Sequence, residues 1–392
     1  MKLFKRLTAV LCAVIMVNTT VKAENFENLS DLGLSAKSAV LMEQSTGSIL
    51  YNVNGDEKLP PASITKIMTL LLVYEAVRDG KINTEDSVRV SAHAASMGGS
   101  QVFLEEGETQ SVADMIKCIA IASANDAAVA MAEYIGGSEE GFVKLMNERA
   151  KELGMENTVF KNACGLDEDG HITTAEDIAK MSAELMKNFP QIREYTTKWQ
   201  DSIVHKTRRG EKEFGLTNTN RLVKWYDGAT GLKTGSTGKA KYCVSATAER
   251  NGMSLIAVIM AADNPKGRFR EAGKLLDYGF ANYEVLIGAK KGDFAGEAEV
   301  IMGESEKVTL ELADDVKALV NKGGEEPVLT FEVTEEIAAP VEKGMKVGEA
   351  VYTADGKIVA EADIVTAENV ERAGFFTVLK RLMKFWNENG LN

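Results

Sequence analysis

Residues 60–77, "PPASITKIMTLLLVYEAV", have the pattern of a helix start followed by an apolar helix. Pro61 and Ser63 are ordinary entry residues, and apolar side chains then recur at helical spacing. Lys66, one turn after Ser63, is unexpected, because a cation opposes the positive end of a helix and a capping box has Glu or Gln there. Two interpretations are open: Ser63 caps the helix, or Ser63 and Lys66 are a nucleophile and its base on one helix face.

The first 23 residues of the 392-residue chain predict a signal peptide. "MKLFKR" is basic, "LTAVLCAVIMV" is an apolar core of 11 residues that is too short to span a bilayer comfortably, and "VKA" fits cleavage after Ala23. We therefore expect the protein to work outside the cytoplasmic membrane. An uncleaved anchor is the alternative.

Cysteine, histidine and charge exclude several classes of function. Cleavage after Ala23 leaves three cysteines, which predict no disulfide framework and are interpreted as buried thiols: Cys118, Cys164 and Cys243. The three histidines lack paired metal-ligand spacing, so we expect no zinc site, and no other part of the sequence leads us to expect a cofactor. The formal net charge is −13, and loss of the leader, with four basic and no acidic residues, brings it to −17. Such a charge argues against nucleic acid as a partner.

Residues 24–283 mix strand and helix patterns. Two strands flank the turn "STGS", two helices meet near Ser123, and buried strands form a hairpin at Asn251–Gly252. A closing helix begins near residue 267. Strands among many helices predict one large α/β or α+β domain.

Residues 284–371 differ from the preceding part of the chain. They contain short segments in which apolar and polar residues alternate, such as "KVTLEL" and "VLTFEV", and a hairpin turn at Asp355–Gly356. The pattern predicts a small β-rich domain. This segment holds 21 acidic and 8 basic residues, a net charge of −13, which is most of the negative charge of the chain without its leader. We interpret it as a solvated spacer.

The C-terminal segment, residues 372–392, predicts an amphipathic helix over "FFTVLKRLMKFW", 375–386. At about 100° per residue its apolar side chains fill one half of the helix and its cations and Thr377 fill the other. This pattern is typical of a helix that lies in the membrane plane, so the outer face of the cytoplasmic membrane is the expected partner. The alternative is a helix docked on the protein's own core.

Two further triplets accompany the first motif. "SAN" at 123–125 lies near the predicted helix junction, and "KTG" at 233–235 precedes the buried strand "KYCVSATA". Ser-x-x-Lys alone says little, because it also occurs at Ser236–Lys239. The three motifs in this order are far more specific and are the set known from β-lactamases and penicillin-binding proteins.

On these motifs the chain resembles the low-molecular-mass penicillin-binding proteins, specifically the serine D-alanyl-D-alanine carboxypeptidases. The resemblance extends to "GGSQVFLEEGE" (98–108), "LGMENTVFKNACGLD" (153–167), "HITTAEDIA" (171–179) and "GRFREAGKLLDYGF" (267–280). It also covers the trailing β-rich domain and the amphipathic tail. It implies a transpeptidase-like α/β (α+β) fold with a five-stranded antiparallel sheet flanked by helices.

The resemblance also implies the chemistry. Ser63, activated by a neutral Lys66, attacks the carbonyl between two D-alanines of a peptidoglycan stem pentapeptide, D-alanine leaves, and water hydrolyses the acyl-enzyme. β-Lactams are expected to acylate Ser63. The implied catalytic residues are Ser63, Lys66 and Ser123, the last as a proton relay between Lys66 and the leaving amine. The implied substrate-binding residues are Asn125, Lys233, Thr234, Gly235, Ser236 and Arg268, with the amides of Ser63 and Ser236 as an oxyanion hole.

The sequence also bears on four other classes of protein. "GSTGKAK" at 235–241 fails as a phosphate loop, because Lys233 stands where a glycine is required and Ala240 follows the lysine. No Gly-x-Ser-x-Gly supports a Ser-His-Asp hydrolase. A serine β-lactamase shares the three motifs, but no E-x-x-L-N segment occurs between 126 and 190. A non-catalytic β-lactam sensor or wall-binding protein stays open and would fail to turn over a peptide.

Overall fold

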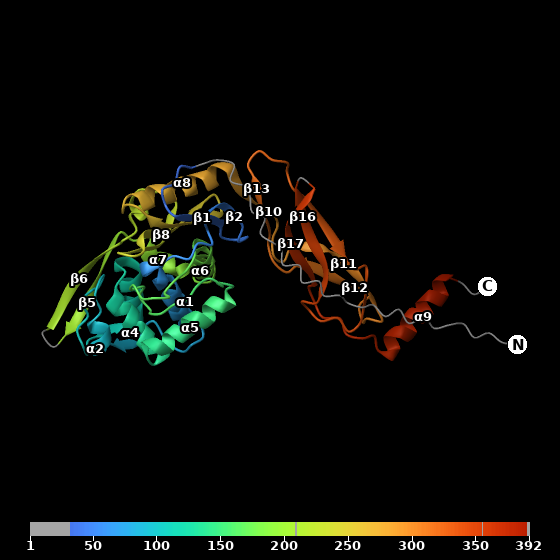
Figure 1. Ribbon diagram of the computed structural model, residues 1–392. Coiled ribbons are helices and arrows are strands. Elements are labelled where there is room, and N and C mark those ends of the chain that lie inside the picture. Colours follow the sequence, from blue (N-terminus) through green and yellow to red (C-terminus); the bar gives the residue numbers. More distant parts are fainter. Residues whose placement is uncertain (1–31, 208–209, 355, 390–392) are drawn as a thin grey trace.

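The computed structural model describes residues 32–207, 210–354 and 356–389. The predicted signal peptide lies outside the described residues, as does Asp355 of the predicted hairpin turn. Two parts of different character follow one another along the chain, and helix α9 (Phe375–Asn389) follows the second (Figure 1).

The first part is built around a five-stranded antiparallel sheet in the order β2-β1-β9-β8-β7. The turn between β8 and β9 is Asn251–Gly252. Both residues have positive φ, as a tight hairpin requires. The predicted five-stranded sheet, the two strands that flank "STGS" and the hairpin at Asn251–Gly252 are therefore confirmed. The strands are β1 (Ser38–Glu43), β2 (Ile49–Val53), β7 (Ala229–Thr237), β8 (Lys241–Arg250) and β9 (Met253–Ala262).

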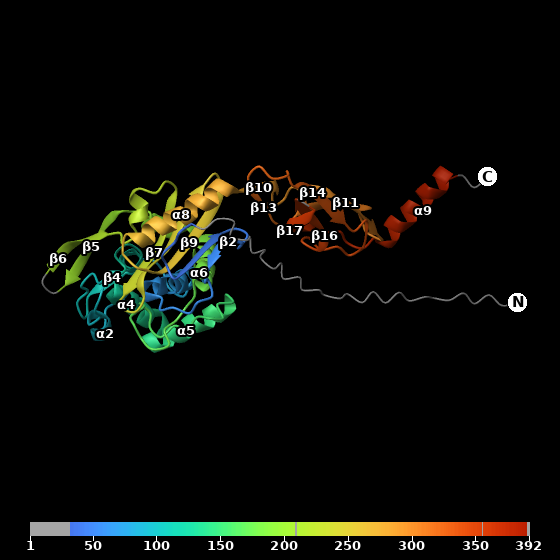
Figure 2. The ribbon, with the colours of Figure 1, turned by 45° about the horizontal axis from the view of Figure 1, so that its top comes forward.

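Both faces of this sheet are covered by helices, because its central strands are apolar on both sides. Successive residues of β1 point to opposite faces of the sheet, so that Val40 and Leu41 belong to two different clusters of buried side chains. Helix α8 (Gly267–Asn282) covers one face, and the remaining large helices pack on the other (Figure 2). Those are α1 (Lys66–Arg78), α3 (Val112–Lys117), α4 (Asn125–Gly136), α5 (Glu139–Glu152) and α6 (Ala175–Asn188).

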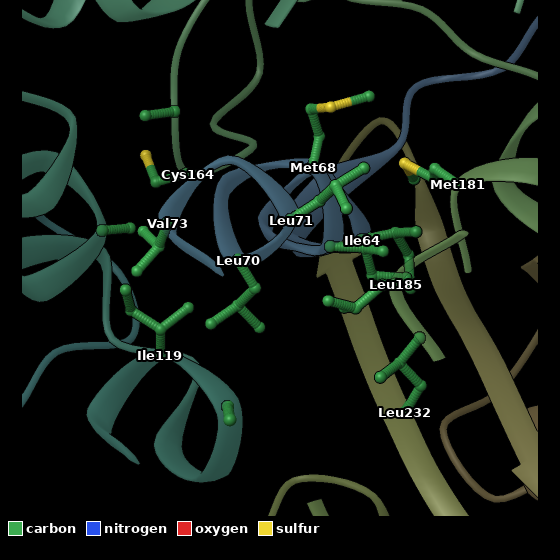
Figure 3. Close-up of a cluster of buried hydrophobic side chains, with 14 of the residues drawn as sticks. Ile64, Met68, Leu70, Leu71, Val73, Ile119, Cys164, Met181, Leu185 and Leu232 are labelled. Atoms are coloured by element: carbon green, nitrogen blue, oxygen red, sulfur yellow. The ribbon is translucent and has the colours of Figure 1, made fainter. Parts of the chain in front are cut away.

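Helix α1 runs through the middle of the larger cluster. Figure 3 shows Met68, Leu70 and Val73 leaving it in different directions, so apolar neighbours surround the helix. A helix that is apolar around most of its circumference belongs in a core, which explains the run quoted above. The start of α1, with Lys66, is consequently anchored by packing.

Smaller elements surround these layers. A long hairpin, β5 (Gln200–Thr207) with β6 (Gly210–Thr217), projects from one end of the first part (Figures 1 and 2). The others are β3 (Ser87–Arg89), β4 (Thr109–Ser111), α2 (Ala92–Ala95), α7 (Arg193–Thr196), the 3₁₀ turns η1 (Ala62–Thr65), η3 (Pro190–Ile192) and η4 (Arg221–Lys224), and the π turn η2 (Cys118–Ala122).

The second part is all β, as the sequence predicts. A six-stranded sheet has the order β14-β16-β17-β12-β11-β15, and β10 pairs with β13. "VLTFEV" is more exposed than its alternation suggests, because β14 is an edge strand, and Phe331 is 43% exposed. The strands are β10 (Tyr283–Ala289), β11 (Phe294–Ile301), β12 (Lys307–Leu312), β13 (Val316–Asn321), β14 (Val328–Val333), β15 (Glu336–Ala338), β16 (Lys346–Ala354) and β17 (Lys357–Thr366).

Helix α9 confirms the predicted tail helix. Its eight apolar side chains between residues 375 and 386 are all exposed, from 37% at Val378 to 82% at Phe376. Its contact with the β-rich part uses Arg381, which donates to the Glu304 carbonyl at 2.9 Å and pairs with Glu306 at 3.0 Å. The polar side of α9 therefore faces the protein. None of the helices in the described ranges has both the length and the hydropathy to cross a bilayer.

Candidate active site

Ser63 lies in the 3₁₀ turn η1, immediately before α1. Neither η1 nor α1 has a side-chain cap at its N-terminus, so Ser63 does not serve as one. The Lys66 Nζ lies 3.0 Å from the Ser63 Oγ. Of the two interpretations of this stretch, the structure favours the pair of interacting side chains.

Lys66 is fully buried and is surrounded by oxygen atoms. Its Nζ contacts the Asn125 Oδ1 at 2.6 Å and the Cys164 carbonyl at 2.7 Å, in addition to the Ser63 hydroxyl. A charged amine donates to all three oxygens. A neutral amine donates to the amide and the carbonyl and accepts a hydrogen bond from the Ser63 hydroxyl. The same geometry therefore fits both protonation states.

Burial favours the neutral form of this amine. Desolvation lowers the pKa of Lys66 from 10.5 to about 8, although the electrostatic effects of Cys164 and Asp126 act in the opposite direction. Lys233, on β7, is also buried, and its pKa lies well below the ordinary value because of desolvation and the neighbouring Lys66 and Arg268. The site thus holds two buried amines, and the charge of Lys66 disfavours that of Lys233.

Ser123 lies between η2 and α4, at the predicted helix junction. Its φ of +61° is left-handed, which ends one helical run and turns the chain into the next. The Lys233 Nζ donates to its hydroxyl at 2.8 Å. The hydrogen bond that the structure shows at Ser123 thus comes from Lys233, and the exchange of a proton between Ser123 and Lys66 stays a prediction.

The orientation of Asn125 follows from its two neighbours. Its Nδ2 donates to the Gly98 carbonyl at 2.6 Å, so its Oδ1 faces the Lys66 amine. On β7, the Thr234 hydroxyl donates to the Thr219 hydroxyl at 2.7 Å. Ser236, one residue beyond Gly235, is exposed at the same strand end.

The structure explains in a way that the sequence did not suggest why residue 235 is a glycine. A Cβ atom there would lie 3.0 Å from the Pro61 carbonyl oxygen and from the Ile64 amide nitrogen. Strand β7 therefore packs directly against the turn that carries Ser63. This close approach brings the first and third motifs together.

Arg268, on α8, uses one of its guanidinium nitrogens to hold two neighbouring strands. Its Nη1 donates to the carbonyls of Gly235 and Cys243, at 2.8 and 3.2 Å, and so ties β7 and β8 to α8. The structure brings Ser63, Lys66 and Asn125 together, and places Lys233 beside Ser123. Arg268 also contributes to the lowered pKa of Lys233, and its role in substrate binding stays a prediction.

Several groups at this site are not recognisable from residue type. The carbonyls of Gly98 and Cys164 orient Asn125 and Lys66, but any residue has a carbonyl. Gly165 has a φ of +87°, and a Cβ atom there would lie 1.9 Å from the Ala62 carbonyl oxygen. The glycine in "ACGLD" was the available signal for this close approach to the Ser63 turn.

Comparison with known proteins identifies the family. Residues 23–264 match the family model described as D-alanyl-D-alanine carboxypeptidase, and residues 287–372 match the C-terminal domain of penicillin-binding protein 5. The D-alanyl-D-alanine carboxypeptidase DacF of Bacillus subtilis is 45% identical over 390 residues, which are 98% of this chain and 99% of the relative.

Two solved structures agree with this match. Penicillin-binding protein 5 of Haemophilus influenzae superposes with a TM-score of 0.76 at 32% identity, covering 88% of this chain and all of that one. Penicillin-binding protein D2 of Listeria monocytogenes, in an ampicillin-bound form, superposes at 0.57 and 33% identity, covering 64% of this chain and all of that one. The resemblance inferred from the three motifs is thus confirmed, and the chain belongs to the D-alanyl-D-alanine carboxypeptidase family of penicillin-binding serine peptidases.

Proposed function

We propose that this protein removes the terminal D-alanine from peptidoglycan stem pentapeptides through an acyl-enzyme on Ser63. The observation that carries the proposal is the 3.0 Å contact between the Ser63 Oγ and a Lys66 amine whose pKa is lowered to about 8. A serine hydroxyl needs a base to become a nucleophile, and the lowered pKa leaves a fraction of this amine neutral near pH 7 and most of it neutral above pH 8.

In this account the proton of Ser63 passes to Lys66 while the oxygen attacks the carbonyl between the two D-alanines. The amides of Ser63 and Ser236 stabilise the oxyanion. The amide bond breaks, and the leaving amine takes a proton by way of Ser123. Water then attacks the ester, which releases the shortened peptide and restores Ser63.

The substrate ends in a carboxylate, and a cationic pocket suits it. Lys233 and Thr234 are the proposed partners of this carboxylate, with Arg268 holding their strand in place. Asn125 is proposed to bind the backbone amide on the acyl side of the scissile bond. Binding the carboxylate favours the charged form of Lys233 over the neutral form that burial favours. Substrate and penicillins compete for the same groups, since a β-lactam also presents a carboxylate beside a reactive amide.

We also propose an arrangement along the chain: a leader at 1–23, a catalytic domain at 24–283, a spacer at 284–371 and a membrane-binding helix at 372–392. Its support is the exposed apolar face of α9, combined with the contact of Arg381 on the opposite side. The catalytic domain then works outside the cytoplasmic membrane, on the side where peptidoglycan lies.

The reaction is tested by D-alanine release from a peptide ending in Lys-D-Ala-D-Ala, with residues 24–392 in detergent. We expect release by the wild type and none by Ser63→Ala. Covalent penicillin binding without release would instead favour a sensor.

The membrane proposal is tested by co-flotation with phosphatidylglycerol-containing vesicles. Truncation after Val370, or Phe376→Ser with Leu382→Ser, should abolish flotation, whereas the control Thr377→Ser should retain it. A truncated protein that still floats contradicts the role given to α9.

A further inference from the structure

Asp126, the residue after the second motif, is a fully buried carboxylate in the first turn of α4. It accepts hydrogen bonds from the backbone amides of Val102 at 3.1 Å, Leu104 at 3.1 Å and Ala127 at 2.9 Å. Within the described ranges, no Lys, Arg or His lies within 4.0 Å of it. Backbone amides and the positive end of α4 therefore compensate its charge.

These bonds hold the loop of residues 98–104 in a backbone conformation that is otherwise unfavourable. Val102 and Leu104 flank Phe103, whose φ is +63° and whose ring is 62% exposed. A bulky residue rarely adopts this left-handed conformation, and an exposed ring has little packing to enforce it. Fastening the amides on both sides of Phe103 to one carboxylate supplies the constraint.

The same loop orients a side chain of the active site. The Gly98 carbonyl accepts a hydrogen bond from the side-chain Nδ2 of Asn125 at 2.6 Å, and the Ser100 carbonyl accepts one from the backbone N–H of Asn125 at 2.7 Å. The Gly98 contact decides which end of the Asn125 side chain faces Lys66. If the loop moved away, the Asn125 side chain could rotate and present its NH₂ group to Lys66. A charged Lys66 amine cannot accept a hydrogen bond from that NH₂ group.

Asp126 also acts on Lys66 through its charge. The Asp126 carboxylate raises the pKa of Lys66, against the larger effect of burial. The coupling between Lys66 and Lys233 has the opposite sign, since Lys66 lowers the pKa of Lys233. Removal of the Asp126 charge therefore lowers the pKa of Lys66 further.

We infer that Asp126 is a positioning residue of this active site, holding the 98–104 loop so that Asn125 presents its oxygen to Lys66. The inference rests on the proposed roles of Ser63 and Lys66. Its bland alternative is that Asp126 only stabilises the start of α4.

Asp177 provides a control. It is a buried aspartate in the first turn of α6, and it holds another loop through the Asn157 backbone amide at 3.1 Å and the Thr158 hydroxyl at 2.8 Å. Unlike Asp126, it also pairs with a lysine, Lys180, at 3.1 Å. It is not among the groups that shift the pKa of Lys66. Asp177→Asn therefore reports the cost of losing a buried structural carboxylate.

The test measures, against pH, the second-order rate of acylation by a fluorescent penicillin, normalised to active sites, together with the thermal midpoint. For Asp126→Asn we expect a maximal rate that is lower by about 10- to 100-fold, because misplaced reacting groups cost that much. We also expect the acidic limb of the curve of acylation rate against pH to move to lower pH in this variant, by a few tenths of a unit to about one unit. Asp177→Asn should lower the midpoint and leave the limb in place.

Asp126→Glu keeps the charge and displaces it, so it should lower the maximum without moving the limb. It also carries the test if Asp126→Asn does not fold. A maximum and limb equal to those of Asp177→Asn would overturn the inference, and so would a wild-type maximum in Asp126→Glu. If the wild type itself showed no acylation that depends on Ser63, the proposed function would fail instead.

Discussion

Gly165→Ala is the substitution whose effect can be worked out most directly from the geometry. A Cβ atom at Gly165 would lie 1.9 Å from the Ala62 carbonyl oxygen and 2.9 Å from the Ser63 amide nitrogen. Ordinary contact begins at 3.4 Å, so the two backbones must separate by roughly 1.5 Å. The residue that moves is the nucleophile or its neighbour, and a misplacement of 1 Å can cost about 100-fold in rate.

The matched control is Gly154→Ala. Gly154 also has a positive φ, +65°, but a Cβ atom there meets nothing within 4 Å. Both variants carry the left-handed strain of about 1–2 kcal/mol. Only Gly165→Ala should also lose acylation by fluorescent penicillin, by about 100-fold. Equal acylation rates for the two variants, at similar thermal midpoints, would refute the reasoning that Gly165 sets the position of Ser63.

The remaining predictions concern protonation and burial. Since the neutral form of Lys66 is the base, acylation should rise with pH up to about 8 and level off above it; a rate independent of pH between about 6 and 9 would contradict this. Lys233→Ala should lower the acylation rate by about 100-fold or more, because it removes the cation proposed for the carboxylate. Cys118, Cys164 and Cys243 are buried with raised pKa values, so the folded protein should not react with a thiol reagent. Rapid modification of native protein would show that one of these thiols is accessible.

Patterns with a strict period were sufficient to predict most of the fold. The two strands that flank "STGS", the hairpin at Asn251–Gly252 and the amphipathic tail helix are all predicted from local sequence, and all three are confirmed. The β14 segment shows the limit of such patterns. Its alternation is that of a half-buried strand, but its edge position leaves Phe331 exposed, and strand order is not a local property of sequence.

The candidate site could be predicted only as far as side-chain chemistry reaches. Lys66 is an unusual residue type at the start of an apolar helix, whereas Ser63 and Lys233 are recognisable as members of the three motifs. The Gly98 and Cys164 carbonyls do comparable work in orienting Asn125 and Lys66, but backbone atoms leave no mark on residue type. The distance between the motifs along the chain likewise gives no indication that β7 packs on the Ser63 turn.

The most direct measurement of the central claim is the location of the covalent penicillin adduct by peptide mapping. The chain offers its own control, because Ser236 and Lys239 form a second Ser-x-x-Lys, with Lys239 exposed and paired with Asp169. We predict that the adduct lies on Ser63, that Lys66→Met abolishes it, and that Lys239→Met leaves it intact. An adduct on Ser236, or full labelling of Ser63 in Lys66→Met, would contradict the account.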